Sequence, residues 1–409
     1  MVINKIKTYV KKGVVFNKKN PARTKVLDLK TEATTEIELL LDKKGYLNAG
    51  RPGFNRLFGR DSLIASWQLL NWDSNIAKAT LEILSELQGD KIDLMREEEP
   101  GKIIHETDFN YHEHPRVPGF PFPYYGSVDS TPLYLILFGF YYRKTHDEKF
   151  LDKHWVNILS AVTWMEKYGD KDQDSFLEYT QNNKKALSNQ CWKDSGEYAI
   201  TNPVAVVEVQ GYKYLALKEV SYLAKTRGDV VFAERLENSA KKLKTAFNEK
   251  FWMEKEGFFA LALDGNKKQH KPIASNAGHL LFTGIIDDNK VDLVVKRLFK
   301  KDLFTSRGIR THSSLEPDFN YESYQLGAVW PHDNWIIAQG LKKLGYKKEY
   351  QQLREAIMKA HDEIGFLPEF YRIKDDKISL KSMNPNFPVV PCYPQAWASG
   401  TLLNFVNEK

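Results

Sequence analysis

Residues 132–143 read Pro-Leu-Tyr-Leu-Ile-Leu-Phe-Gly-Phe-Tyr-Tyr-Arg, a run that would be apolar on almost every side of a helix. Residues 61–72 and 203–223 have the same character, and both Pro132 and Pro203 suit the first turn of a helix. A helix that is apolar all round is buried on all sides. These three segments are therefore predicted to lie in the interior of the fold.

Helices of a second kind alternate with the first. Each has its apolar residues in one stripe: Leu151, Trp155, Ile158, Val162 and Met165 in one, Phe232, Leu236, Ala240, Leu243, Phe247 and Phe251 in another, and Tyr350, Leu353, Ile357, Ala360 and Ile364 in a third. Such helices cover an inner layer with one face and meet water with the other. The alternation is typical of an inner ring of helices wrapped by an outer ring.

The lengths of the connections support the same arrangement. Links from inner to outer helices are short, whereas the links back to the next inner helix are long, at 44–59, 89–128, 169–202, 253–272, 301–320 and 363–391. Long connections inside a compact domain usually serve function, and in a closed ring of helical hairpins they all lie on one face.

With a helix at about 31–43 as the outer partner of the last helix, 394–406, the sequence contains about twelve helices. We therefore predict an all-α fold, an (α/α)6 barrel of six hairpins. Residues 1–409 are expected to form one domain with a short basic N-terminal arm, about residues 1–28.

Composition narrows the class of protein. The net charge of +6 is spread along 409 residues without a basic stripe interleaved with aromatic residues, so no nucleic-acid partner is predicted. No apolar run reaches about 18 residues, and the N-terminus lacks the pattern of a secretory signal, so no membrane partner is predicted. The two cysteines, Cys191 and Cys392, are compatible with a reducing compartment. We expect a cytoplasmic protein, and these patterns do not determine whether it is a monomer or a homo-oligomer.

Two acidic residues lie in aromatic settings punctuated by Gly or Pro. Asp194 lies in Cys-Trp-Lys-Asp-Ser-Gly, residues 191–196, and Glu369 in Gly-Phe-Leu-Pro-Glu-Phe-Tyr, residues 365–371. A carboxyl group beside an aromatic ring is partly desolvated, which raises its pKa, and Asp194 near Trp192 is expected to titrate higher than Glu369. Glycoside hydrolysis requires two such groups, and the pair therefore indicates carbohydrate chemistry, although a loop carboxylate is more often a cap or turn former.

Phe58-Gly59-Arg60-Asp61 resembles the Phe-Gly-Arg-Asp motif of the amylo-α-1,6-glucosidase family, the glucosidase half of glycogen debranching enzymes. Further motifs similar to that family follow in order, among them Asp129-Ser130-Thr131-Pro132, Trp192-Lys193-Asp194-Ser195-Gly196, Glu208-Val209-Gln210-Gly211, Trp330-Pro331-His332-Asp333-Asn334, Leu367-Pro368-Glu369 and Pro394-Gln395-Ala396-Trp397. The resemblance implies an (α/α)6 barrel that hydrolyses with inversion, with Asp194 as general acid, Glu369 as general base and no cofactor.

By the same resemblance, Arg60 and Asp61 bind the hydroxyls of the sugar in the cleavage subsite. The other residues expected to contact the carbohydrate substrate are Phe58, Asp129, Trp192, Lys193, Gln210, Tyr324, Trp330, His332, Asp333, Gln395 and Trp397. Two departures from the family are expected: the β-rich domain that often precedes the barrel is not expected before this one, and Tyr324-Gln325 stands where many relatives have a His-Asn pair.

The expected activity is that of an inverting α-1,6-glucosidase related to glycogen debranching enzyme. A trehalase-like enzyme and a hydrolase of glucosylglycerate or mannosylglycerate are the alternatives within the hydrolases. An (α/α)6 sugar epimerase and a non-catalytic sugar-binding barrel would have the same fold, but the presence of both candidate acids argues against them.

Two clusters have residue types that bind metals. The segment from His105 to His114 lacks a second histidine four residues after the first, because Phe109 stands there. The segment 170–174 is similar to the start of a calcium loop, but Ser175 replaces the glycine and Gln181 the closing glutamate. A loop or subsite wall and a solvated turn are the favoured interpretations, and no metal site is predicted.

Overall fold

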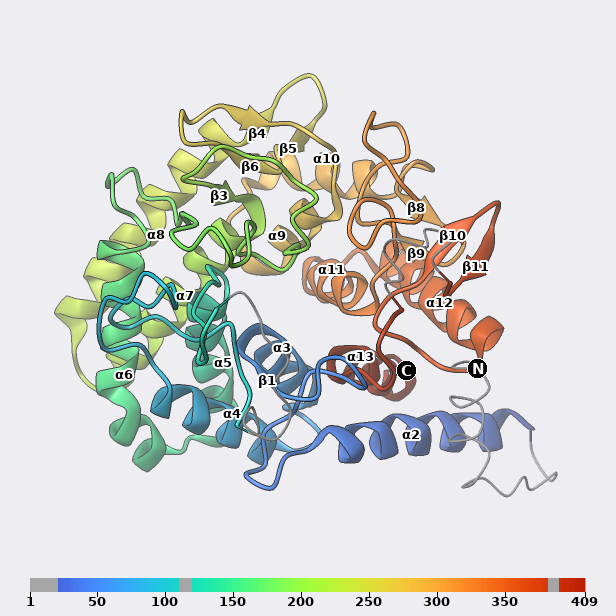
Figure 1. The fold of residues 1–409 in the computed structure, drawn as a ribbon, viewed down its shortest axis with the longest axis horizontal. Coiled ribbons are helices and arrows are strands. Elements are labelled where there is room, and N and C mark those ends of the chain that lie inside the picture. Colours follow the sequence, from blue (N-terminus) through green and yellow to red (C-terminus); the bar gives the residue numbers. More distant parts are fainter. Residues whose placement is uncertain (1–20, 110–119, 382–389, 409) are drawn as a thin grey trace.

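The structure, a computed structural model, describes residues 21–109, 120–381 and 390–408. Within them, the α-helices α2 to α13 form two concentric rings (Figure 1). The inner ring consists of α3 (Gly59–Leu69), α5 (Ser130–Thr145), α7 (Val207–Thr226), α9 (Leu280–Thr283) preceded by the 3₁₀ helix η1 (Ser275–His279), α11 (Pro331–Leu344) and α13 (Ala396–Asn407). The outer ring consists of α4 (Ser74–Glu86), α6 (Glu148–Lys167), α8 (Val230–Lys250), α10 (Asp288–Leu298), α12 (Lys347–Ile364) and α2 (Pro21–Leu40).

The inner ring closes on itself. Each inner helix packs against the next, and the last inner helix, α13, packs against the first, α3. The two kinds of helix differ in burial as their sequences predict: every residue of α5 from Ser130 to Gly139 is buried, whereas α6 buries mainly the stripe around Ile158 and Val162. The predicted all-α (α/α)6 toroid is confirmed.

Two predicted helix boundaries are wrong. The inner helix expected from Pro203 begins at Val207, because the strand β3 (Ala205–Val206) precedes it and pairs with β6 (Ala262–Leu263). The outer helix expected at about 31–43 spans Pro21–Leu40, so the arm predicted to reach about residue 28 ends earlier. Residues 1–20 of that arm lie outside the described residues.

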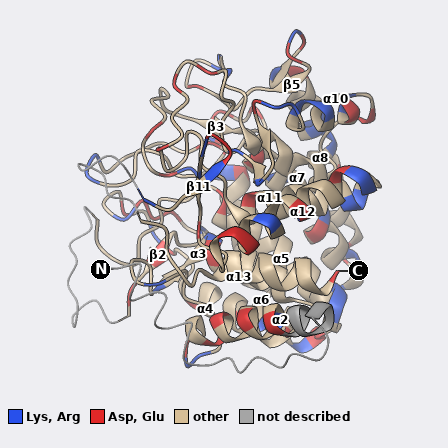
Figure 2. Cartoon of the chain, turned by 90° about the vertical axis from the view of Figure 1, so that its right-hand side faces the viewer, with Lys and Arg blue, Asp and Glu red and all other residues tan. Residues whose placement is uncertain are grey.

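The short and long connections lie where the sequence places them. Gly284 and Gly345 end α9 and α11 with φ of +87° and +83°, a left-handed conformation that lets the chain reverse at once into the outer helix. The strands lie in the long connections; in Figure 2, β2, β3 and β11 are labelled on the left-hand side, whereas β5 is labelled near α10 at the upper right.

The remaining strands form short antiparallel pairs. These are β1 (Leu57–Phe58) with β2 (Glu106–Thr107), β4 (Trp252–Met253) with β5 (Phe258–Phe259), β6 with β7 (Gln269–His270), β8 (Phe304–Thr305) with β9 (Gly308–Ile309), and β10 (Arg372–Lys374) with β11 (Lys377–Ser379). In the described part of the chain, no helix qualifies as a candidate for a membrane span.

Candidate active site

A pocket of about 670 Å³ lies where several long connections meet the first turns of the inner helices. Its lining residues come from five of the six long connections and from the starts of α3 and α13. Both candidate catalytic acids line it, together with these predicted substrate-binding residues: Phe58, Arg60, Asp61, Trp192, Tyr324, Trp330 and Trp397. The ring therefore brings together residues that are far apart in the sequence.

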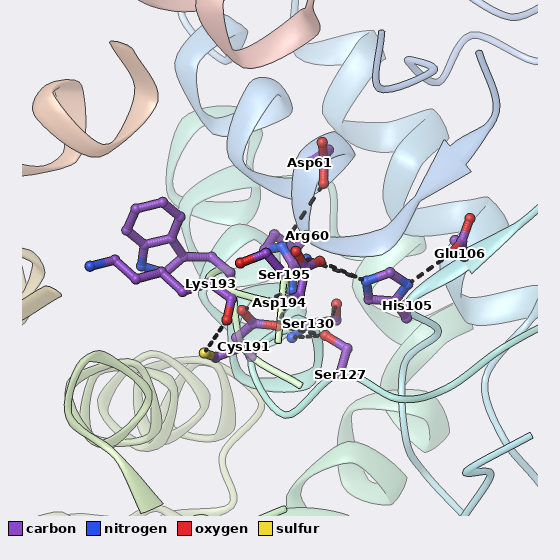
Figure 3. Close-up of polar contacts among 12 residues, drawn as sticks. Arg60, Asp61, His105, Glu106, Ser127, Ser130, Cys191, Lys193, Asp194 and Ser195 are labelled. Atoms are coloured by element: carbon purple, nitrogen blue, oxygen red, sulfur yellow. Dashed lines mark hydrogen bonds and ion pairs between the residues drawn. The ribbon is translucent and has the colours of Figure 1, made fainter. Parts of the chain in front are cut away.

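Arg60 is the central cation of the site. It lies in the first turn of α3, where Phe58 is the N-cap, and its side chain is buried. Its Nη1 donates to both oxygens of Asp129 at 3.2 Å, and its Nη2 donates to Oδ2 of Asp194 at 2.7 Å (Figure 3). Ser127 Oγ donates to Asp129 at 2.5 Å, so the inner carboxylate is held in place and orients the guanidinium toward the pocket.

The pKa of Asp194 contradicts the sequence-based expectation. Burial by itself raises the pKa of this carboxyl, but the hydrogen bond from His105 and the charge of Arg60 outweigh it, so the pKa of Asp194 lies below its ordinary value. The neighbouring Trp192 was expected to raise it. The tertiary contacts with His105 and with Arg60, which lies 134 residues away in the sequence, reverse the direction.

The buried side chain of Gln325 holds the connection that contains Asp194. Its Oε1 accepts from the backbone N–H of Ser195 at 2.9 Å, and its Nε2 donates to the carbonyl of Trp192 at 2.8 Å. Glu197 accepts from the Ser195 hydroxyl at 2.8 Å and from the backbone N–H of Gln325 at 2.9 Å. These four bonds fix the backbone on both sides of the Asp194 carboxyl.

Glu369 lies on the connection between α12 and α13. Its Oε2 accepts from the backbone N–H of Cys392 at 2.9 Å, and its Oε1 accepts from the Tyr324 hydroxyl at 2.5 Å. Burial raises the pKa of Glu369 to about 7 and outweighs the two hydrogen bonds, which lower it, while the charges of Asp61 and Asp194 add smaller increases. The expected order of the two acids is therefore wrong: Glu369 titrates above Asp194.

Asp61 is another carboxyl group of the pocket. Burial raises its pKa to about 6, while Arg60 and the bond from Gln395 act in the opposite direction. Gln395 Nε2 donates to Asp61 at 3.2 Å, and the Gln395 side chain also caps α13 by accepting from the backbone N–H of Trp397. A carboxyl at this position can accept hydrogen bonds from sugar hydroxyls.

Aromatic rings form much of the apolar wall. Trp330 packs edge-on against Tyr324 at 4.7 Å and against Trp192 at 5.8 Å, and it stacks on Phe370 at 5.2 Å between ring centroids. Rings fixed in this way offer flat apolar faces to a sugar without losing side-chain entropy when it binds.

Several predicted substrate-binding residues do not line this pocket: Asp129, Lys193, Gln210, His332, Asp333 and Gln395. Gln395 and Asp129 lie behind Asp61 and Arg60, respectively. His332 is buried with its ring stacked on Trp397 at 3.8 Å, and burial lowers its pKa well below the ordinary value.

The others serve the interior of the barrel. Lys193 points away from His105 (Figure 3), and its Nζ donates to the Thr311 carbonyl at 2.6 Å. Burial lowers the pKa of Lys193 to about 8. The carboxamide of Gln210 bonds the backbone of Leu177 and Val206, and the Asp333 carboxylate bonds His279 at 2.7 Å.

Sequence reasoning missed several residues that line the pocket as charged or polar groups: Arg56, His105, Glu106, Glu197 and Glu322. His105 and Glu106 were considered as metal ligands, but a loop or subsite wall was the favoured interpretation of their segment, without a role for either residue. The pairing of β1 with β2 places Glu106 opposite Phe58, beside the start of α3. A strand pair of two residues leaves almost no signal in the sequence.

The structure describes the two segments with metal-binding residue types to different extents. His112, Glu113 and His114 lie outside the described residues. Among the described residues, Asp170, Asp172 and Asp174 are close enough to share an ion. The Nζ of Lys267 lies 2.7 Å from Asp172 and 2.5 Å from Asp174, so this turn, predicted to be solvated, contains an ion-pair network.

Comparison with known proteins identifies the family. The model of the mannosylglycerate hydrolase MGH1-like glycoside hydrolase domain matches residues 127–375, more than half of the chain. The chain belongs to the MGH1-like glycoside hydrolase family. The six-hairpin superfamily expected from the sequence is therefore right, but the match is to mannosylglycerate hydrolase-like enzymes and not to the debranching glucosidases.

Two relatives match over short segments. A mannosylglycerate hydrolase from Rubrobacter radiotolerans is 28% identical over 160 residues, which are 38% of this chain and 36% of that protein. Mannosylglycerate hydrolase MGH1 from Selaginella moellendorffii is 33% identical over 86 residues, 21% of this chain and 18% of that protein. The matched segments thus span about a third or less of the curated relatives.

Solved structures show the same fold. The GH63 mannosylglycerate hydrolase from Thermus thermophilus, solved in complex with glucose, has a TM-score of 0.69 at 15% identity, and the alignment covers 93% of this chain and all of that one, 100%. A structure named Glycosidase Wild Type has a TM-score of 0.66 at 13% identity over 95% of this chain and 98% of its own. Family relatives and structural neighbours are glycoside hydrolases.

Proposed function

We propose that this protein hydrolyses a small α-glycoside with inversion, as a mannosylglycerate hydrolase-type enzyme whose general acid is Asp194 and whose general base is Glu369. One observation supports this above the others: two carboxyl groups from separate connections line one pocket, together with the Arg60–Asp61 pair. An inverting glycosidase needs an acid for the leaving oxygen and a base for the attacking water, on opposite sides of the sugar.

The proposed reaction follows from the contacts. Asp194 gives a proton to the glycosidic oxygen as the bond from that oxygen to the anomeric carbon breaks. Water attacks from the other side, and Glu369 takes one of its protons. Tyr324 and the backbone N–H of Cys392 hold the Glu369 carboxylate in place. No net proton is consumed.

The charges of the ligand-free site are the reverse of those that these roles require. Asp194 is the more acidic group and Glu369 the more basic one. Before each turnover, Asp194 must therefore receive a proton and Glu369 must be ionised. The two groups interact, so a pH profile reports the pair and not either residue alone.

The family name favours a glycosylglycerate as substrate, with mannose or glucose as the sugar. The lining of the pocket favours a second candidate, an α-glucoside with an uncharged aglycone such as a 1,6-linked glucose. The carboxyl groups that line the pocket are those of Asp61, Glu106, Asp194, Glu197, Glu322 and Glu369. Among the described lining residues the arginines are Arg56 and Arg60, and both are already paired with carboxylates.

A panel of matched substrates tests the proposal. The purified protein is incubated with mannosylglycerate, glucosylglycerate, glucosylglycerol, isomaltose, panose and trehalose, and released sugar is measured. Glucosylglycerate and glucosylglycerol differ only in a carboxylate, so their ratio of kcat/KM measures the preference for charge directly. Asp194→Asn and Glu369→Gln are the controls for catalysis. A folded protein that cleaves no α-glycoside would refute the proposed function.

A further inference from the structure

His105 joins two carboxyl groups at the wall of the pocket. Its Nε2 lies 3.4 Å from Oδ2 of Asp194, and its Nδ1 lies 3.5 Å from Oε1 of Glu106 (Figure 3). The imidazole is buried, with 3% of the side chain exposed. The proposed roles of Asp194 as acid and Glu369 as base give no function to His105 or to its contact with Glu106.

The backbone and two aromatic rings hold the imidazole in this place. The carbonyl of His105 accepts from the N–H of Gly59 at 2.7 Å, and its N–H donates to the carbonyl of Tyr124 at 2.7 Å. Phe58 and Tyr124 pack edge-on against the ring, with centroids at 5.5 and 5.6 Å. The ring therefore keeps one nitrogen toward each carboxyl group.

Taken together, the charged groups around His105 favour its protonated form, although Arg60 opposes it. Arg60 and Asp61 face it from α3, Glu106 from β2, and Asp194 from the connection between α6 and α7. Burial by itself lowers the pKa of His105, but the bonds to Asp194 and Glu106 raise it above the ordinary value despite the repulsion from Arg60. A proton shared by this pair therefore lies mainly on His105 in the ligand-free protein.

We propose that His105 is the positioning residue that stores the proton for Asp194, with Glu106 holding the imidazolium in register. A sugar in the pocket displaces water from Asp194 and disfavours its charged form. The proton then moves from Nε2 of His105 to Oδ2 of Asp194, which leaves a neutral imidazole beside a neutral carboxylic acid.

The remaining proton transfers return Asp194, His105 and Glu369 to their starting protonation states. The Asp194 carboxyl turns about its soft Cβ–Cγ bond and gives the proton to the leaving oxygen. Its side chain is 23% exposed to the pocket and has room to turn. After the products leave, His105 takes a proton from water, and Glu369 releases to water the proton that it took from the nucleophile.

This inference rests on the proposed function and makes a separate prediction about pH. Without the imidazole, Asp194 holds a proton only up to its own pKa. In His105→Gln, the alkaline limb of the pH profile for a natural α-glycoside should therefore move to lower pH. At pH 7 its kcat should fall about 10- to 100-fold with little change in KM, because the pH at which the acid loses its proton falls by about one to two units.

The glycosyl fluoride of the same sugar supplies the comparison substrate, because fluoride leaves without acid assistance. His105→Gln should hydrolyse it at nearly the wild-type rate. Glu106→Gln, which leaves the imidazole but removes its anionic partner, should move the same limb in the same direction by a smaller amount. If thermal melting shows that His105→Gln does not fold, the pH profile of Glu106→Gln tests the role of His105 in its place.

A matched control uses the pair of the buried His154 and the partly exposed Glu82, whose nitrogen and oxygen lie 2.9 Å apart between α6 and α4. His154→Gln should leave both pH profiles unchanged. Equal losses on glycoside and fluoride at every pH in the His105 and Glu106 variants, or an unmoved alkaline limb, would overturn the role of His105. A wild-type protein that is inactive on all α-glycosides would instead refute the proposed function itself.

Discussion

Replacing Tyr324 by Phe tests the environment of the proposed base. The change removes a hydroxyl that donates to Oε1 of Glu369 at 2.5 Å and leaves the ring that packs against Trp330. A hydrogen bond to a charged group contributes about 1.5–3 kcal/mol, and about 1.36 kcal/mol corresponds to one pKa unit. Because the lost bond favours the carboxylate, the pKa of Glu369 should rise from about 7 to roughly 8–9.

The rate follows from that change. At pH 7 about half of Glu369 is ionised in the wild type, whereas about a tenth to a hundredth would be ionised in Tyr324→Phe. Hydrolysis of a glycosyl fluoride, which depends on the base alone, should fall about 5- to 50-fold at pH 7 and return to the wild-type rate at high pH.

The assay is the pH dependence of fluoride release for both proteins, with Tyr346→Phe as control, since Tyr346 bonds Asp292 outside the pocket. The acidic limb should move to higher pH in Tyr324→Phe only. A limb that stays near pH 7, or a loss that persists at high pH, would refute the reasoning from the Tyr324–Glu369 bond.

Three further outcomes are expected. An α-glycoside followed by proton NMR should first release the β-anomer of the sugar, with the carboxyls of Asp194 and Glu369 about 6.5–9.5 Å apart, and an initial α-anomer would contradict inversion. Burial raises the pKa of Glu36 from 4.5 to about 7, so its contribution to stability is complete below pH 4.5 and is lost as the pH rises to about 7. In Glu36→Gln the melting temperature should therefore decline less over that range, and an unchanged slope would exclude Glu36 as the cause. Lys267→Met should lower the free energy of unfolding by about 1–3 kcal/mol in a denaturant titration, because Asp172 and its neighbours lose their shared cation, and unchanged stability would show that the ion pairs contribute nothing.

Much of the fold could be predicted because its signals are local. The all-round apolar character of α5 and the stripe of α6 record which sides of each helix meet other residues. The alternation of short and long connections then requires a ring. The start of α7 was missed because a two-residue strand follows Pro203, and only the pairing with β6 makes those residues extended.

The sequence predicted which residues form the site better than it predicted their pKa values. The motifs identified Arg60, Asp61, Asp194 and Glu369, and the structure brings all four to one pocket. Their roles in catalysis stay predictions. Lys193 was expected to contact substrate from the resemblance of residues 192–196 to the family motif, but its Nζ donates to the Thr311 carbonyl in the interior.

The sequence by itself determined the class of helix at each position, the alternation of connections and the identity of two candidate acids, because each depends on residues close together in the chain. Only the tertiary structure decided their charges. The pKa of Asp194 depends on Arg60 and His105, and that of Glu369 on Tyr324 and Cys392, all from other segments of the chain. Coulomb and hydrogen-bond energies depend on distances in space, which the ring closure sets and the order of residues does not.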